Sequence, residues 1–173
     1  MRQVMEVKTV YTLETATEEI REKILEKHWD INIDYEWWNC TCDELSELGL
    51  ECLGFDIDRG SYCDLRFKLS VHEVAQNILN SHGESCDTWK TANNFIDAHD
   101  PIFSEYLNED SDHYESIEYE DKLMEREEQF LKDLQEDYLS MLRREYDYLT
   151  SEEAITETII CNGYEFLENG DIY

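Results

Sequence analysis

Apolar positions between Lys122 and Leu149 recur at spacings of three, four and seven residues. Such spacings place apolar side chains on one broad face of an α-helix. Acidic residues fill the positions between them, so a helix here would turn an apolar face to a core and carboxylates outward. The sequence therefore predicts a long, acidic amphipathic helix. Its apolar face would comprise Leu123, Met124, Phe130, Leu131, Leu134, Tyr138, Met141 and Leu142.

Two segments nearer the N-terminus alternate apolar and polar residues, which is the period of a half-buried β-strand. They are residues 52–57 and 62–69, separated by a short polar segment that contains Gly60. We expect Gly60 to supply the positive φ that a tight turn needs. The pattern predicts an antiparallel β-hairpin.

The two ends of the chain also carry strand signals. Residues 4–13 have apolar side chains at Val7, Val10 and Leu13, which favours a strand. Near the C-terminus, Asn169 and Gly170 form a dipeptide typical of hairpin turns. One or two strands within residues 164–173 would then complete the sheet that residues 4–13 begin.

Several helix boundaries are marked by capping signals. A Ser or Thr followed three residues later by Glu is a capping box, in which hydroxyl and carboxylate each accept a hydrogen bond from a free backbone N–H. Thr15 with Glu18, and Ser70 with Glu73, have this pattern. Gly49 occupies a helix C-cap position. Further helices are predicted at residues 15–29, 35–48, 71–80, 89–98 and 152–161.

These elements together predict an α+β fold. A small antiparallel sheet would carry packed helices, with the long acidic amphipathic helix on the outside. Asp100-Pro101 indicates a turn before the acidic region, because proline disfavours a helical residue before it. We expect a single domain over residues 1–173, with an acidic helical region at 102–149 inserted between sheet elements.

The charge of the chain narrows its function. The 173 residues include 43 Asp and Glu against 14 Lys and Arg, which gives a formal net charge of −29 at pH 7. For solubility, a small domain needs a net charge of only about 2–8 in magnitude. Direct binding to DNA, RNA or anionic membranes is excluded as the default, because phosphate selects Lys and Arg. Three explanations would account for the acidity: a basic protein partner, a high-salt environment, or a role as a decoy for a polyanion. The 11 Tyr and 4 Trp are unusual in a halophilic protein, which counts against the second explanation.

The apolar runs are too short for a signal peptide or a membrane span. We therefore expect a cytoplasmic protein whose cysteines are reduced thiols. With 41% hydrophobic residues, the chain also has enough apolar surface to fold.

Signals for metal binding and catalysis are weak. Cys40 and Cys42 have one residue between them, where structural zinc sites have two to four. The Asp56-Ile57-Asp58 stretch begins like a calcium loop but lacks its later ligands. Residues typical of a nucleophile elbow, a phosphate loop, a dinucleotide site or a zincin helix are missing. The sequence predicts a protein that is not an enzyme and uses no cofactor and no metal.

The candidate binding site is the run from Glu105 to Asp121, which contains no Lys or Arg. On a helix, carboxylates three and four residues apart lie roughly 5–6 Å from each other, close to the spacing of phosphates along a nucleic-acid strand. The alternative is a solvated face of an acidic protein. The predicted contacts are Glu105, Glu109, Asp110, Asp112, Glu115, Glu118, Glu120 and Asp121, with Trp37 and Tyr114 as aromatic anchors.

Residues 11–38, 54–67 and 151–170 resemble a loose group of small acidic proteins encoded by phages and mobile elements, which are antitoxin-like or uncharacterised. The resemblance covers under half of the chain and transfers no active-site residue. It implies a mobile-element protein acting in a bacterial cytosol. Charge and implied origin together are similar in character to DNA-mimicking anti-CRISPR and antirestriction inhibitors.

The sequence therefore predicts a non-catalytic inhibitor of a host defence nuclease, of the anti-CRISPR or antirestriction type. It would act as a nucleic-acid mimic in the basic groove of a nucleic-acid-binding protein, as a monomer or a homodimer. An antitoxin that blocks a basic toxin or ribonuclease is the alternative. A metal-dependent enzyme is a third hypothesis, which bound metal in the purified protein would support.

Overall fold

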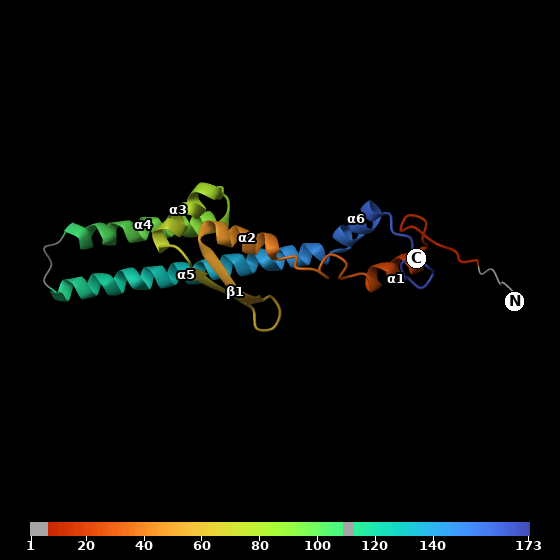
Figure 1. The fold of residues 1–173 in the computed structure, drawn as a ribbon, viewed down its shortest axis with the longest axis horizontal. Helices are drawn as coiled ribbons and strands as arrows, with labels where there is room; N and C mark the ends of the chain where they lie inside the picture. The colour runs from red at the N-terminus through yellow and green to blue at the C-terminus, as the bar shows by residue number, and fades with distance from the viewer. Residues whose placement is uncertain (1–6, 109–112) are drawn as a thin grey trace. The chain divides into compact units, whose positions relative to one another are not determined.

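The computed structural model describes residues 7–108 and 113–173, with their side chains except those at 105–108 and 113–118. Within these residues the chain has six helices and a two-stranded antiparallel sheet, so the predicted α+β class is confirmed (Figure 1). The chain forms two compact units. The central unit is Trp38–Arg143, and the terminal unit joins the residues up to Trp37 with Arg144–Tyr173. The expectation of a single domain stays a prediction.

The sheet of the central unit is the predicted hairpin. Strand β1 (Leu50–Asp56) pairs with β2 (Tyr62–Phe67), with an irregularity in register between Cys52 and Gly54. The expected role of Gly60 was wrong, since the positive φ of the turn belongs to Ser61, at 23°. Side chains hold this turn, because the Ser61 hydroxyl donates to the carbonyl of Asp58 over 2.8 Å.

Helix α2 (Asn39–Leu48) ends at its predicted C-cap, and helix α3 (Val71–Ser81) begins at its predicted N-cap. Gly49 has φ of +91°, as expected for a C-cap, and a Cβ there would lie 2.5 Å from the Cδ1 of Leu69. The capping box of Ser70 and Glu73 at the start of α3 is confirmed. Helix α2 begins later than predicted, because residues 35–38 lie in bends and turns before it.

Helix α4 (Asp87–Asn108) continues through Pro101, so the predicted turn at Asp100-Pro101 was wrong. Proline removes one backbone hydrogen bond and crowds the preceding turn. Ring contacts support the helix on both sides of it. His99 stacks on Phe103 with ring centroids 5.6 Å apart and packs on Phe95 at 4.9 Å.

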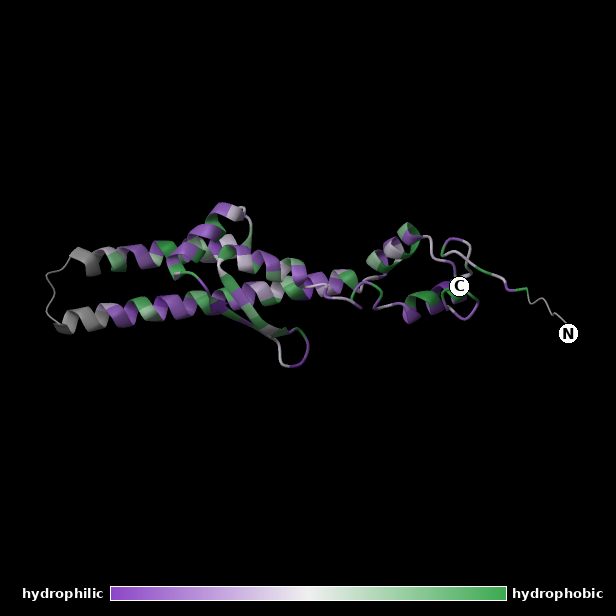
Figure 2. Cartoon of the chain, in the orientation of Figure 1, coloured by the Kyte–Doolittle hydropathy of each residue, from purple (hydrophilic) through white to green (hydrophobic). Residues whose placement is uncertain are grey.

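Helix α5 (His113–Leu149) begins before the predicted start at Lys122. It lies antiparallel beside α4 (Figure 1), since Thr91 bonds Asp137 and Phe95 stacks on Phe130 at 4.4 Å. Its apolar face is narrower than predicted, because Met124 is exposed. Figure 2 shows hydrophilic and hydrophobic residues interleaved along α5. The fully buried positions recur every fourth residue at Phe130, Leu134, Tyr138 and Leu142.

The terminal unit packs α1 (Glu18–Lys27) and α6 (Glu152–Asn162) around a small core. Ser151 caps α6 as expected, accepting a hydrogen bond from the N–H of Ala154. The predicted capping box at Thr15 was wrong. Thr15 bonds Thr12 in a turn instead, and α1 begins at Glu18. The core residues are Leu13, Ile20, Ile24, Ile155, Ile159 and Phe166.

The chain ends pair only at isolated points. Tyr11 bridges Phe166, and Phe166 bridges Ile172, but no strand forms across residues 7–13 and 164–173. Residues 4–6 of the predicted first strand lie outside the described residues. The terminal pairings therefore do not extend the β1–β2 sheet, which contains only those two strands in the described chain.

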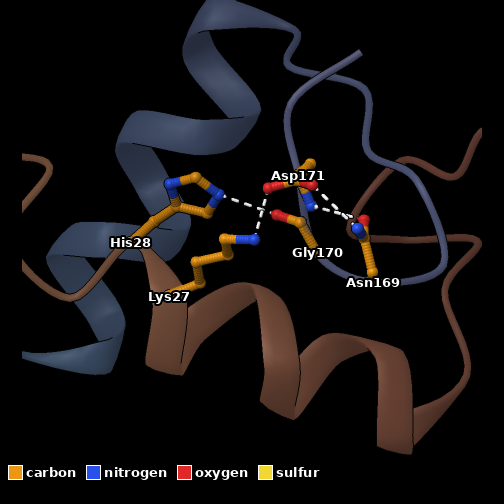
Figure 3. A network of polar contacts seen from close by, with 5 residues as sticks. All are labelled: Lys27, His28, Asn169, Gly170 and Asp171. Carbon is orange, nitrogen blue, oxygen red and sulfur yellow. Dashed lines mark hydrogen bonds and ion pairs between the residues drawn. The ribbon is translucent and has the colours of Figure 1, made fainter.

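The expected turn at Asn169-Gly170 is present and is bound to α1 (Figure 3). Gly170 has φ of +82°. His28 at the end of α1 donates from Nε2 to the carbonyl of Gly170 over 2.9 Å, and Lys27 forms an ion pair with Asp171. Asn169 closes the turn through two hydrogen bonds with Asp171. This network joins the C-terminal turn to α1.

Candidate functional site

The predicted acidic run spans the end of α4 and the first part of α5. The backbone is helical at Glu105, Tyr114, Glu115 and Glu118, and their side chains are not described. Glu120 and Asp121 are exposed on α5. Glu109, Asp110 and Asp112 lie outside the described residues. The run is therefore divided between two helices, and its described carboxylates lie on α5.

The predicted aromatic anchor Trp37 is half-buried in the terminal unit. Its ring lies 5.8 Å from that of Tyr146, with an angle of 54° between the planes. The neighbouring Trp38 packs edge-on against Phe55 in the central unit at 5.7 Å. Both indoles thus contact aromatic residues of the same chain, and a role for Trp37 in binding a partner stays a prediction.

Four carboxylates further along α5 form what we call the α5 stripe, comprising Asp121, Glu125, Glu128 and Glu136. All four are exposed. An α-helix turns by about 100° and rises by about 1.5 Å per residue. Viewed down the axis of α5, the four residues therefore lie within about 80° of arc. Successive residues are about 6, 4.5 and 12 Å apart along the axis. Lys132 lies among them on the same face. The stripe points away from the buried face that holds Leu134 in the core.

The ion pairs of the described residues leave the α5 stripe untouched. The acids that they use lie elsewhere, on α1, α2, α4, α6, β1 and the C-terminal turn. None of the four carboxylates forms an ion pair within the described chain, although Lys132 lies on the same face. A cationic partner would meet them without displacing an internal contact.

Asp137, beside the stripe, shows the electrostatic environment of this helix. Burial raises the pKa of its carboxyl, and the nearby Asp87, Asp133 and Glu136 raise it further. The hydroxyl of Thr91 donates to Asp137 over 2.7 Å, which opposes that rise in pKa. Acidic side chains therefore crowd the junction of α4 and α5.

A partly buried polar network links helices of the central unit. His82 Nδ1 lies 2.6 Å from the hydroxyl of Thr88, and its Nε2 lies 3.3 Å from Glu44. The Tyr138 hydroxyl donates to the same carboxylate over 3.1 Å. Nε2–H of His82 faces the Glu44 carboxylate, and the Thr88 hydroxyl can pair with Nδ1 as donor or acceptor.

This network has the order hydroxyl, imidazole, carboxylate that activates a nucleophile in many hydrolases. Thr88 is only 2% exposed, however, so its hydroxyl does not reach a substrate. The network instead joins α2, α4 and α5 through partly buried hydrogen bonds. Sequence reasoning missed it, because Glu44, His82 and Tyr138 are far apart in the chain.

Three thiols gather where α2 meets the hairpin. Cys42, Cys52 and Cys63 interact, and burial with the neighbouring Cys52 raises the pKa of Cys63 to about 12 and that of Cys42 to about 11. Such thiols are protonated at neutral pH and are poor nucleophiles. All six cysteines are free in the structure.

One pocket lies between α4 and α5, with a volume of about 160 Å³. Its walls include Phe95, Arg126, Phe130 and Asp133. Pockets for drug-sized ligands have roughly 300–1,000 Å³. This pocket is therefore smaller than a typical site for a drug-sized ligand.

A second group of side chains has the composition of a metal site. His72 of α3 and His99 and Asp100 of α4 place one ligand atom each within 4.8 Å of one another. His99 is 6% exposed, and the other two are about half exposed. Sequence reasoning missed this group too, because the histidines lie far apart in the sequence and no metal motif joins them.

Comparison of the chain with protein-family models, curated proteins and solved structures gave no match. Among the described helices, none has the length and apolar character to cross a membrane.

Proposed function

We propose that this protein is a non-catalytic inhibitor that inserts α5 into the basic groove of a nucleic-acid-binding protein, where its carboxylates replace phosphates. The partner would be a host defence nuclease of the restriction or CRISPR type, in a bacterial cytosol. The observation that carries the proposal is the α5 stripe, which is exposed and makes no ion pair within the described chain.

Rigidity supports this function. The opposite side of α5 is fixed in the core by Phe130, Leu134 and Tyr138, each at most 2% exposed. The carboxylates are thus held on a regular helix before binding, so association loses little backbone entropy. A flexible acidic tail would lack this advantage, because its backbone would have to be ordered on binding.

Electrostatics supports it as well. A net charge of −29 produces a field that attracts a basic groove and raises the association rate. This attraction falls with ionic strength, since the screening length is about 10 Å at 0.1 M salt and about 3 Å at 1 M. Inhibition by this surface is therefore expected to be salt-sensitive.

The test compares two variants with equal changes in net charge. The stripe variant carries Asp121→Lys, Glu125→Lys, Glu128→Lys and Glu136→Lys. The control variant carries four exposed acids of the terminal unit changed to Lys, namely Glu14, Glu22, Glu26 and Glu157. Circular dichroism and thermal unfolding check that both variants fold.

DNA cleavage by restriction endonucleases and by CRISPR effector nucleases, and RNA cleavage by toxin ribonucleases, are measured at low and high salt with each protein. We expect the wild type to inhibit cleavage by a member of one class. The stripe variant should lose more than about tenfold in inhibition, and the control should keep most of it, because position as well as total charge matters. Equal inhibition by both variants would exclude the α5 stripe as the site. Inhibition confined to a toxin ribonuclease would instead support the antitoxin alternative.

A further inference from the structure

The first turn of α3 meets the middle of α4 at a cluster of two histidines and one aspartate. His72 Nδ1 lies 3.6 Å from Oδ1 of Asp100, and His99 Nδ1 lies 3.5 Å from the same oxygen. The two imidazole rings are 6.2 Å apart at their centroids, with an angle of 45° between them. Three potential ligand atoms from two helices therefore converge on one point.

These separations are long for hydrogen bonds but suit a shared metal ion. Good N–H···O bonds span about 2.7–3.2 Å between heavy atoms. Ligands about 2.0–2.2 Å from a tetrahedral zinc ion lie roughly 3.3–3.6 Å from each other. The two distances to Asp100, 3.5 and 3.6 Å, match edges of such a tetrahedron, and the two imidazoles place their ligand atoms within 4.8 Å of each other.

The surroundings suit a preformed site. The side chain of His99 is 7% exposed and is held between the rings of Phe95 and Phe103, at 4.9 and 5.6 Å. The side chains of His72 and Asp100 are 47% and 48% exposed, so an ion can reach them from solvent. One side of the cluster is thus apolar and rigid, and the other is open.

Neighbouring interactions fix the backbone on which the ligands stand. The capping box of Ser70 and Glu73 holds the first turn of α3, which includes His72. The Glu73 carboxylate bonds the N–H and hydroxyl of Ser70 at 3.1 and 2.6 Å. Ligands on helices held in this way keep their geometry better than ligands on loops.

We propose that His72, His99 and Asp100 bind a divalent transition-metal ion of the zinc type. Two imidazoles and one carboxylate are the protein ligands of several open zinc sites, which keep a fourth position for water. The net charge of −29 further favours a cation. The site joins α3 to α4, and it goes beyond the proposed inhibitory surface on α5.

Zinc binding is measured by calorimetry on the full chain after chelator treatment, with excess Mg²⁺ to occupy non-specific carboxylates. We expect one site that His72→Ala and Asp100→Asn each weaken by more than about tenfold. Asp97→Asn is the matched control, since it removes the same charge from an exposed position on α4. It should bind zinc as the wild type does.

Imidazole NMR signals distinguish this site from zinc held by the thiols. With ¹⁵N-labelled histidine, the ring signals of His72 and His99 should shift together at one equivalent of ZnCl₂, while that of His28 stays in place. Binding that leaves the signals of His72 and His99 unmoved would overturn the proposal. Equal zinc affinity for the wild type and Asp100→Asn would overturn it too.

Discussion

Gly170 is the residue where backbone conformation and close packing coincide. Its φ of +82° lies in the left-handed region, and a Cβ there would lie 3.1 Å from the carbonyl oxygen of Lys23. Gly163 has φ of +63°, and a Cβ there would have no neighbouring atom within 4 Å. The two glycines therefore separate the cost of conformation from the cost of crowding.

We expect Gly170→Ala to lower the free energy of unfolding by about 2–3 kcal/mol, since it combines left-handed strain with displacement of the α1 backbone. Gly163→Ala should cost about 1 kcal/mol, because only the strain applies. Urea unfolding measures both values. A smaller effect at Gly170 than at Gly163 would show that α1 moves freely away from the turn.

Asp137 shows a residue whose charge opposes folding. Burial and nearby acids raise the pKa of its carboxyl above the unfolded value of 3.8. The folded state therefore binds this proton more tightly than the unfolded state does. The stabilisation of the folded state by protonated Asp137 is fully present below pH 3.8. It is lost as the pH rises through the pKa that this carboxyl has in the folded state.

Asp137→Asn should therefore raise the melting temperature at pH 7, by about 1–3 °C. The amide oxygen still accepts from Thr91, while the charge is removed. The gain should shrink toward acid pH, where the wild-type carboxyl is protonated. Thermal unfolding between pH 3 and 7 measures this trend, and a loss of stability at pH 7 would contradict it.

At the scale of the element, α5 combines the core and the proposed binding surface in one helix. Residues four apart lie one above another on a helix, so Phe130, Leu134, Tyr138 and Leu142 form a continuous buried row. The stripe carboxylates lie away from that row. Substitutions on the two sides should therefore affect different properties, namely stability and partner binding.

Leu134→Ala should lower the free energy of unfolding by about 2–5 kcal/mol, because it leaves a cavity at a fully buried position. Met124→Ala is the control on the same helix. Met124 is 55% exposed, so its truncation should cost less than about 0.5 kcal/mol. Similar losses for both variants, measured by urea unfolding, would contradict the observed face of α5.

At the scale of the whole molecule, charge repulsion is the dominant electrostatic feature. Lys and Arg number 14 against 43 acids, so most carboxylates have no basic partner available in the chain. Repulsion among like charges destabilises the compact state, and salt screens it. The acidity therefore has a cost in stability.

We expect the melting temperature to rise by several degrees between about 10 mM and 0.5 M NaCl, as screening weakens this repulsion. KCl should act equally, since screening depends on ionic strength. A melting temperature that falls with added salt would show that attractive ion pairs, rather than repulsion, dominate the folded state.

The sequence was sufficient to predict those features that depend on residues close together in the chain. The Ser70–Glu73 capping box, the Gly49 C-cap and the Ser151 N-cap each depend on residues within a turn of one another. The hairpin and the apolar periodicity of α5 depend on repeating patterns, and they too were predicted. The predicted contacts ended at Asp121, however, and did not include Glu125, Glu128 and Glu136 of the α5 stripe.

Contacts between residues far apart in the chain, or the packing around them, decided the features that the sequence did not predict. Pro101 lies within α4 beside the stack of His99 on Phe103, and Thr15 bonds Thr12 rather than capping α1. The sequence by itself determined the caps at Gly49, Ser70 and Ser151, the hairpin, the apolar periodicity of α5 and the excess of negative charge. Only the tertiary structure placed His72 beside Asp100, and His82 beside Glu44, because such contacts depend on the packing of helices far apart in the chain.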